Sequence, residues 1–96
     1  MFLVVAPMLV LPPELTHAQA RACAMAMSQE MAAVRGSKVV LNASQLIKFD
    51  SSALALMLQC RREALALGKN FTVHGLTPPL AKLATLYGIE SLLTAA

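Results

Sequence analysis

Side chains able to carry out chemistry are few in this chain, and they lie far apart in the sequence. The five acidic residues are Glu14, Glu30, Asp50, Glu63 and Glu90. No two of them are close enough to indicate the carboxylate pair of an acid–base catalyst. The two histidines, His17 and His74, have no neighbouring ligands, whereas a metal site needs three or four. We therefore expect no enzyme active site, no bound metal and no cofactor.

The cysteines and glycines do not supply a nucleophile or a phosphate-binding loop. Cys60 is predicted on a helix among apolar neighbours, where its thiol stays protonated, so a nucleophilic pair with His74 is not expected. Cys23 lies in another predicted helix, and both cysteines are interpreted as buried thiols of a reducing compartment. The four glycines stand at the ends of predicted elements, unlike the clustered glycines of a phosphate loop.

One short pattern stands out, because an acid and two hydroxyls, Asp50, Ser51 and Ser52, precede a predicted helix. A helix N-terminus presents free N–H groups and a partial positive charge. A phosphate on Ser51 or Ser52 would therefore be stabilised there. Helix capping by Asp50 or Ser51 explains the same residues without further function, and from spacing alone it is the favoured interpretation. The spacing leaves both interpretations open.

The composition indicates one small folded domain, residues 1–96. The chain is 57% hydrophobic and only 14% charged, whereas soluble domains carry roughly 25% charged residues, so a disordered chain is excluded. The apolar excess indicates a surface that a partner covers. The net charge is +3, but the basic residues are dispersed and only Arg61 and Arg62 are adjacent. We therefore expect no nucleic-acid partner.

The apolar N-terminus is not predicted to be a signal peptide or a membrane span. No positive charge precedes residues 1–11, and three prolines, Pro7, Pro12 and Pro13, interrupt the apolar run. A spanning helix needs about 20 unbroken apolar residues. Residues 2–5 and 8–11 are predicted as two short strands instead. We expect a cytoplasmic protein without direct insertion into a membrane.

The remaining sequence alternates predicted helices and strands. Helices are expected over residues 17–34, 52–67 and 78–87, strands over 38–42 and 71–75, and a short turn or helix over 89–93. Thr16 with Gln19 fits a capping box, and Thr77 with Pro78 fits a helix start. The order β-β-α-β-α-β-α predicts an α/β fold. The opening strands are expected to pair as an antiparallel hairpin, which gives a small mixed sheet of about four strands.

The chain resembles the STAS domain family over nearly its whole length. Residues 39–58 read Val-Val-Leu-Asn-Ala-Ser-Gln-Leu-Ile-Lys-Phe-Asp-Ser-Ser-Ala-Leu-Ala-Leu-Met-Leu, which is similar to the family's signature. The stretches 68–80 and 83–89 match its last strand and helix, and 9–16 matches the approach to its first helix. The resemblance implies the STAS fold.

Within this family the chain is most similar to MlaB-like proteins. The likeness implies a non-enzymatic, cytoplasmic accessory subunit of the Mla phospholipid ABC transporter, which maintains outer-membrane lipid asymmetry. The expected partner is an MlaF-like ATPase subunit and, through it, a membrane permease at the inner membrane. The residues expected to bind the partner are Asp50, Ser51, Ser52, Leu54, Leu56 and Gln59.

The resemblance also implies an alternative function, that of an anti-sigma factor antagonist. In those relatives the second hydroxyl of the motif, here Ser52, is phosphorylated by an anti-sigma factor kinase. In MlaB-like proteins the first hydroxyl, here Ser51, contacts the ATPase. Ala53 departs from the glycine usual in the family, which puts the local loop geometry in doubt. The sequence leaves both functions, and phosphorylation of Ser51 or Ser52, open.

Overall fold

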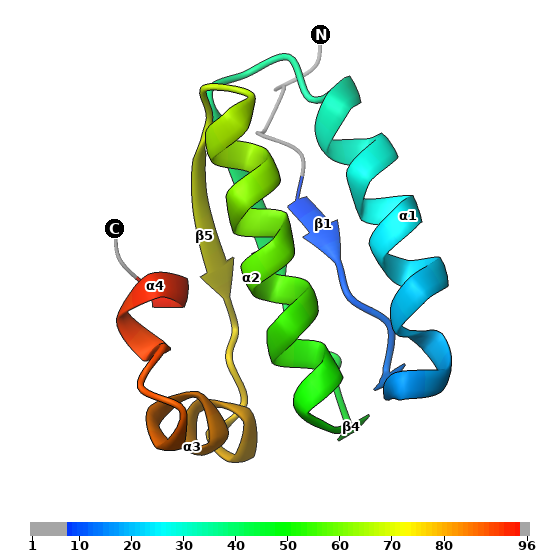
Figure 1. The fold of residues 1–96 in the computed structure, drawn as a ribbon, viewed down its shortest axis with the longest axis vertical. Helices are drawn as coiled ribbons and strands as arrows, with labels where there is room; N and C mark the ends of the chain where they lie inside the picture. Colours follow the sequence, from blue (N-terminus) through cyan, green and yellow to red (C-terminus); the bar gives the residue numbers. More distant parts are fainter. Residues whose placement is uncertain (1–7, 95–96) are drawn as a thin grey trace, which may run out of the picture.

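The structure is a computed structural model that describes residues 8–94, in which strands and helices alternate (Figure 1). The strands are β1 (Met8–Val10), β2 (Glu14–Leu15), β3 (Lys38–Asn42), β4 (Lys48–Phe49) and β5 (Asn70–His74). The helices are α1 (His17–Ala33), α2 (Ser51–Ala66), α3 (Pro78–Leu86) and α4 (Glu90–Thr94).

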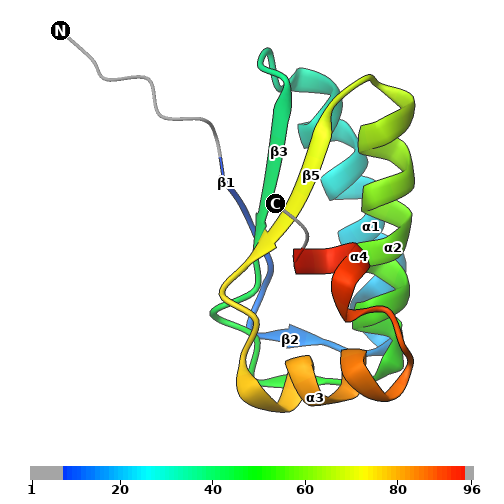
Figure 2. The same cartoon turned by 90° about the vertical axis from the view of Figure 1, so that its left-hand side faces the viewer.

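The main sheet is parallel, with the strand order β1-β3-β5. Val40 in the central strand lies opposite Met8 on one side and Thr72 on the other. Parallel neighbours need a crossover connection, which α1 and α2 provide. Val39 and Leu41 alternate with more exposed neighbours and are buried. These two residues are buried because α1 and α2 lie together on one side of the sheet (Figure 2).

A second, two-residue ladder holds the starts of the two long helices side by side. β2 pairs in parallel with β4, and Leu15 lies opposite Phe49. One residue follows β2 before α1 begins, and one residue follows β4 before α2 begins. The ladder therefore fixes the N-termini of α1 and α2 at the same end of the molecule (Figure 1).

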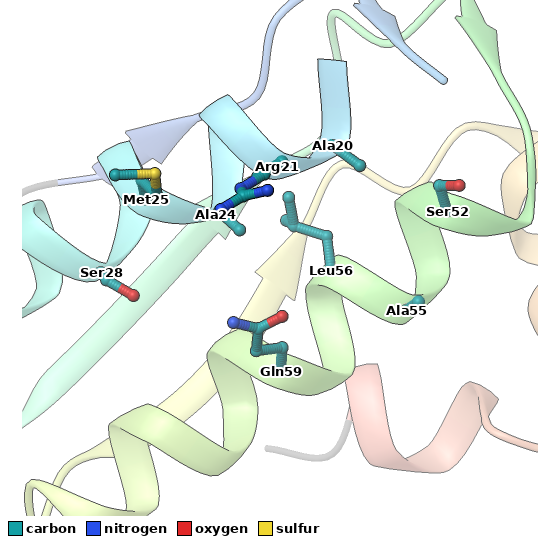
Figure 3. Close-up of a pocket in the computed structure, with 9 residues that line it drawn as sticks. All are labelled: Ala20, Arg21, Ala24, Met25, Ser28, Ser52, Ala55, Leu56 and Gln59. Atoms are coloured by element: carbon teal, nitrogen blue, oxygen red, sulfur yellow. The ribbon is translucent and has the colours of Figure 1, made fainter. Parts of the chain in front are cut away.

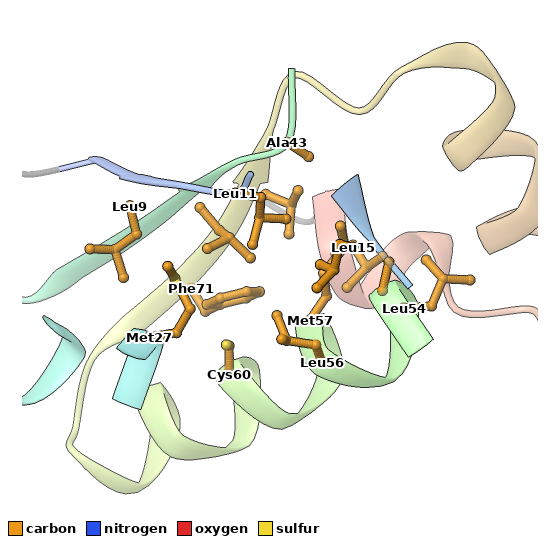
Figure 4. Close-up of a cluster of buried hydrophobic side chains, with 14 of the residues drawn as sticks. Leu9, Leu11, Leu15, Met27, Ala43, Leu54, Leu56, Met57, Cys60 and Phe71 are labelled. Carbon is orange, nitrogen blue, oxygen red and sulfur yellow. The ribbon is translucent and has the colours of Figure 1, made fainter. Parts of the chain in front are cut away.

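The hydrophobic core is one cluster that receives side chains from the sheet and from all four helices. Its most deeply buried large members are Leu11, Leu15, Met31, Leu41, Leu54, Met57, Leu80, Leu93 and Val39. Figure 4 shows Met57, Cys60 and Phe71 meeting between α2 and the sheet. Across residues 8–94 no polar or charged residue is buried. α2 is the central helix, since it buries six residues whereas α1 buries two.

Most of the predicted elements are confirmed to within one or two residues. The Thr16 N–H donates to Gln19 Oε1 at 2.9 Å, as the capping box requires. Thr77 precedes α3 as predicted, although its buried hydroxyl makes no hydrogen bond. The two-residue strands β2 and β4 are not in the prediction, because they are too short for a periodic pattern.

The described strands pair only in parallel. The strand expected at residues 2–5 lies outside the described residues, and with it the antiparallel hairpin that would make the sheet mixed. Within 8–94, no helix has the length and apolarity needed to cross a membrane.

Candidate functional site

Asp50 joins the N-termini of the two long helices. Its Oδ1 accepts the Ser52 N–H at 2.8 Å, which caps α2, and its Oδ2 accepts the His17 N–H at 3.0 Å, which belongs to α1. The pKa of this exposed carboxyl lies below its ordinary value, because the backbone N–H groups of His17 and, next, Ser52 stabilise the charged form. Asp50 is therefore ionised at neutral pH and committed to contacts within the chain.

The two hydroxyl residues after Asp50 differ in their surroundings. Ser51 is the first residue of α2 and is exposed, whereas Ser52 is half-buried and its N–H is bound to Asp50. Capping is thus done by the carboxylate, as the sequence allowed, and neither hydroxyl is needed for it. Ser51 is the more accessible of the two.

A groove of about 360 Å³ runs between α1 and α2, beginning at Ser52 (Figure 3). It is lined by Ala20, Arg21, Ala24, Met25 and Ser28 from α1, and by Ser52, Ala55, Leu56 and Gln59 from α2. Three of these nine residues are alanines, whose short side chains leave the space between the helices open. Met25, Ala55 and Gln59 are exposed along its walls. The groove therefore combines five apolar side chains with the polar side chains of Arg21, Ser28, Ser52 and Gln59, and at Ser52 it reaches the residue next to Ser51 in the sequence.

At Ser28, at the far end of the groove, a side-chain contact joins the two helices. The Ser28 hydroxyl lies 2.8 Å from one carboxylate oxygen of Glu63 and 2.6 Å from the other, and donates to this carboxylate. Glu63 is half-buried, so the contact is partly shielded from water. Together with Asp50 at the other end, it fixes α1 against α2 and gives the groove a defined shape.

Comparisons with known proteins identify the fold and the family. A family model described as "Mlab, STAS domain" matches residues 3–94. The chain belongs to this STAS family. A search of curated protein sequences gives no match. The expected STAS relationship is thus confirmed.

Two solved structures share the fold of this STAS domain. One is the anti-sigma factor antagonist SpoIIAA in its unphosphorylated form, with a TM-score of 0.73, 22% identity, and coverage of 99% of this chain and 84% of that one. The other is an anti-sigma-factor antagonist (STAS) domain protein from Planctomyces limnophilus, with a TM-score of 0.77, 14% identity, and coverage of 91% and 78%. At these identities the likeness establishes the fold.

The STAS fold brings most of the predicted partner-binding residues to one region but removes Leu54 from it. Ser52 and Gln59 line the groove, and Leu56, which is 3% exposed, forms part of its floor. Leu54 is 1% exposed and packs in the core. The predicted contact between Leu54 and a partner is therefore wrong for its side chain, which has almost no accessible surface. Three helix positions turn the side chain by about 300°, so Ser51 and Leu54 point only about 60° apart, and the packing of the core decides that Leu54 is buried while Ser51 is exposed.

The α1 side of the groove is absent from the sequence-based prediction. Arg21, Met25 and Ser28 have the i, i+4, i+7 spacing of one helix face, which is a signal the sequence contains. What the sequence lacks is the information that this face borders Ser52 and Gln59 on α2. His17 as a partner of Asp50 is missed for the same reason.

Two further features of this STAS domain concern chemical reactivity, namely groups of potential metal ligands and the protonation of the thiols. Within 8–94 there is no group of three potential metal-ligating acids, histidines or cysteines. Burial raises the pKa of Cys60 to about 12, with smaller contributions from Glu63 and Cys23, and burial also raises the pKa of Cys23. Both thiols are therefore protonated at neutral pH and are poor nucleophiles.

Proposed function

We propose that this STAS domain is a non-enzymatic accessory subunit of an ABC-type phospholipid transporter. It binds the cytoplasmic ATPase subunit, of the MlaF type, through the N-terminus of α2 and the adjoining groove. The observation that carries the proposal is the exposed Ser51 beside an open groove whose shape Asp50 and the Ser28–Glu63 contact hold fixed. The family description, "Mlab", supports the transporter rather than another STAS role.

The chemistry of the site favours docking over reaction. Because Asp50 is committed to two backbone N–H groups, the surface presented to a partner consists of the Ser51 hydroxyl and a groove that carries the guanidinium of Arg21 and the amide of Gln59 among apolar side chains. A surface with fixed geometry loses little conformational entropy on binding. By binding one ATPase conformation better than another, the domain shifts the population of the ATPase toward it. It reaches the inner membrane only through the ATPase and permease.

The test is the variant Ser51→Arg. An arginine at the centre of a packed interface is expected to weaken ATPase binding at least about tenfold, which removes co-purification. The fold remains intact because Ser51 is exposed. Binding is measured by co-purification and by titration of the isolated ATPase subunit, and folding by circular dichroism.

The matched control is Ser91→Arg, the same substitution at an exposed serine of α4. It is expected to leave ATPase affinity and folding unchanged. Unchanged affinity of Ser51→Arg would place the contact elsewhere on the domain, and binding by neither wild type nor control would refute the transporter role.

The alternative is an anti-sigma factor antagonist switch in which Ser52 is phosphorylated. The Ser52 N–H donates to Asp50 Oδ1, which places this residue next to a carboxylate. A phosphate on Ser52 would therefore add negative charge close to the negative charge of Asp50. Such repulsion would loosen the junction of α1 and α2 and release a partner. Incubation with an anti-sigma factor kinase and ATP tests it: phosphate found by mass spectrometry on Ser52 supports the switch, and its absence argues against it.

A further inference from the structure

Ile47 stands out on the surface because its side chain is highly exposed although its backbone is held by a hydrogen bond. Its side chain is 82% exposed, the largest value among the exposed large hydrophobic residues of the described chain. Its N–H donates to the Pro13 carbonyl at 2.8 Å, and the N–H of Lys48 donates to the same oxygen at 3.0 Å. The preceding Leu46 is buried. The position of Ile47 is therefore set by the β2–β4 ladder rather than by a loose loop.

Single exposed hydrophobic residues are common on proteins and need no explanation by themselves. Ile47 differs in its location, since it lies four residues before Ser51, immediately before β4, the strand that leads into α2. At no more than about 3.6 Å per residue, its Cα lies within roughly 14 Å of that of Ser51. A standard interface buries about 800 Å² per partner, a patch roughly 30 Å across. An interface centred on Ser51 is therefore wide enough to reach Ile47.

We propose that Ile47, with the exposed Pro13 beside it, is the apolar anchor of the ATPase-docking surface and enters an aliphatic pocket on the ATPase subunit. This inference rests on the proposed function and names a contact outside the partner-binding residues expected from the family resemblance. The exposed Lys48 follows directly, so the rim of that pocket must be neutral or acidic. Because its backbone is already held, ordering Ile47 on binding requires little loss of entropy.

The experiment measures the affinity of the ATPase subunit for Ile47→Ala and Ile47→Asp, next to wild type and Ser51→Arg. Loss of an apolar anchor is expected to raise Kd about tenfold for the alanine variant and more for the aspartate variant. Thermal stability should not change, since the side chain contributes little to the core. The control is Leu67→Ala, a half-exposed residue at the opposite end of α2, which should bind as wild type does.

The outcomes separate this inference from the proposed function. If Ser51→Arg disrupts binding but Ile47→Ala binds like wild type, the anchor is refuted and the docking site stands. If wild type does not bind the ATPase, both are refuted. Sedimentation with phosphatidylglycerol vesicles and sedimentation equilibrium are run on the same proteins. If Ile47→Ala keeps its affinity for the ATPase but loses vesicle binding, Ile47 contacts a lipid surface and the proposal is overturned. If it keeps that affinity but no longer forms a dimer that the wild type forms, Ile47 contacts a second copy of the chain, and the proposal is likewise overturned.

Discussion

Asp50 is the residue on which the geometry of the candidate site depends, because its two oxygens accept N–H groups from two helices. Its pKa is lowered in the folded protein, chiefly by the His17 N–H and then by that of Ser52. A carboxyl with a depressed folded pKa contributes stability above its unfolded pKa, about 3.9. That contribution disappears as the pH falls through the lower, folded pKa.

We expect Asp50→Asn to lower the melting temperature at neutral pH, because the amide retains one acceptor oxygen and loses the charge. The difference between wild type and variant should shrink as the pH falls below the unfolded pKa, about 3.9, and through the lower pKa of the folded protein. Melting curves at several pH values measure it. A difference that is constant over this range would mean that the charge of Asp50 is unimportant.

A second prediction at this scale concerns thiol reactivity. Burial raises the pKa of Cys60 to about 12, so almost no thiolate exists at a pH near 8. Iodoacetamide should leave Cys60 unmodified in native Cys23→Ser protein and modify it fully in guanidinium chloride. Peptide mass spectrometry gives the readout, and rapid native modification would contradict the buried position of Cys60.

At the scale of elements, the turn after β5 packs tightly on the turn after β3. Gly75 has φ of +75°, and a Cβ built on it would lie 2.8 Å from the Cβ of Ser44. The Ser44 N–H is itself held by Asn42 Oδ1 at 2.9 Å, and the Ala43 N–H donates to the carbonyl of His74 at 2.8 Å. The two turns therefore fix each other, just before the segment that leads to Ile47 and α2.

Gly75→Ala tests this packing, with Gly88→Ala as its control. Gly88 also has a positive φ, of +70°, but nothing lies within 4 Å of a Cβ built there. Both variants should lose about 1–2 kcal/mol of stability from the left-handed backbone. Gly75→Ala should lose at least about 1 kcal/mol more, because Ser44 must move. Urea denaturation measures both, and equal losses would argue against the contact.

At the scale of the whole molecule, the described elements share one core, so the candidate site is coupled to distant packing. α4 lies far from Ser51 along the chain, yet Leu93 of this helix is fully buried in the same cluster as Leu11, Leu15 and Met57. Unfolding is therefore expected to be cooperative for the sheet and all four helices together.

Leu93→Ala should reduce the free energy of unfolding by about 2–5 kcal/mol, as expected for a fully buried leucine. The adjacent Leu92 is partly exposed, and Leu92→Ala should change it by no more than about 0.5 kcal/mol. Denaturation is followed by the fluorescence of a label on α2 and, separately, by circular dichroism. The two signals should report one and the same transition. Separate transitions would show that α4 folds independently of the rest.

The sequence alone predicts those features that depend on residues close together in the chain. Helix boundaries follow from capping residues such as Thr16 with Gln19 and from apolar periodicity, and the structure confirms them. The strand of residues 38–42 follows from a short β-branched run. Asp50 as the cap of α2 is equally local, since the carboxylate bonds an N–H two residues away. The STAS relationship is also predicted, because the family's motifs are contiguous.

Tertiary structure decides the features that join distant residues. The bond from His17 to Asp50 spans 33 residues, and Ser28 meets Glu63 across 35. The period of a helix shows that it has an apolar face, but which side chains on that face stay accessible depends on all the elements packed around it. For this reason the sequence placed Leu54 among the partner contacts, whereas the fold buries it and opens the groove between α1 and α2 instead.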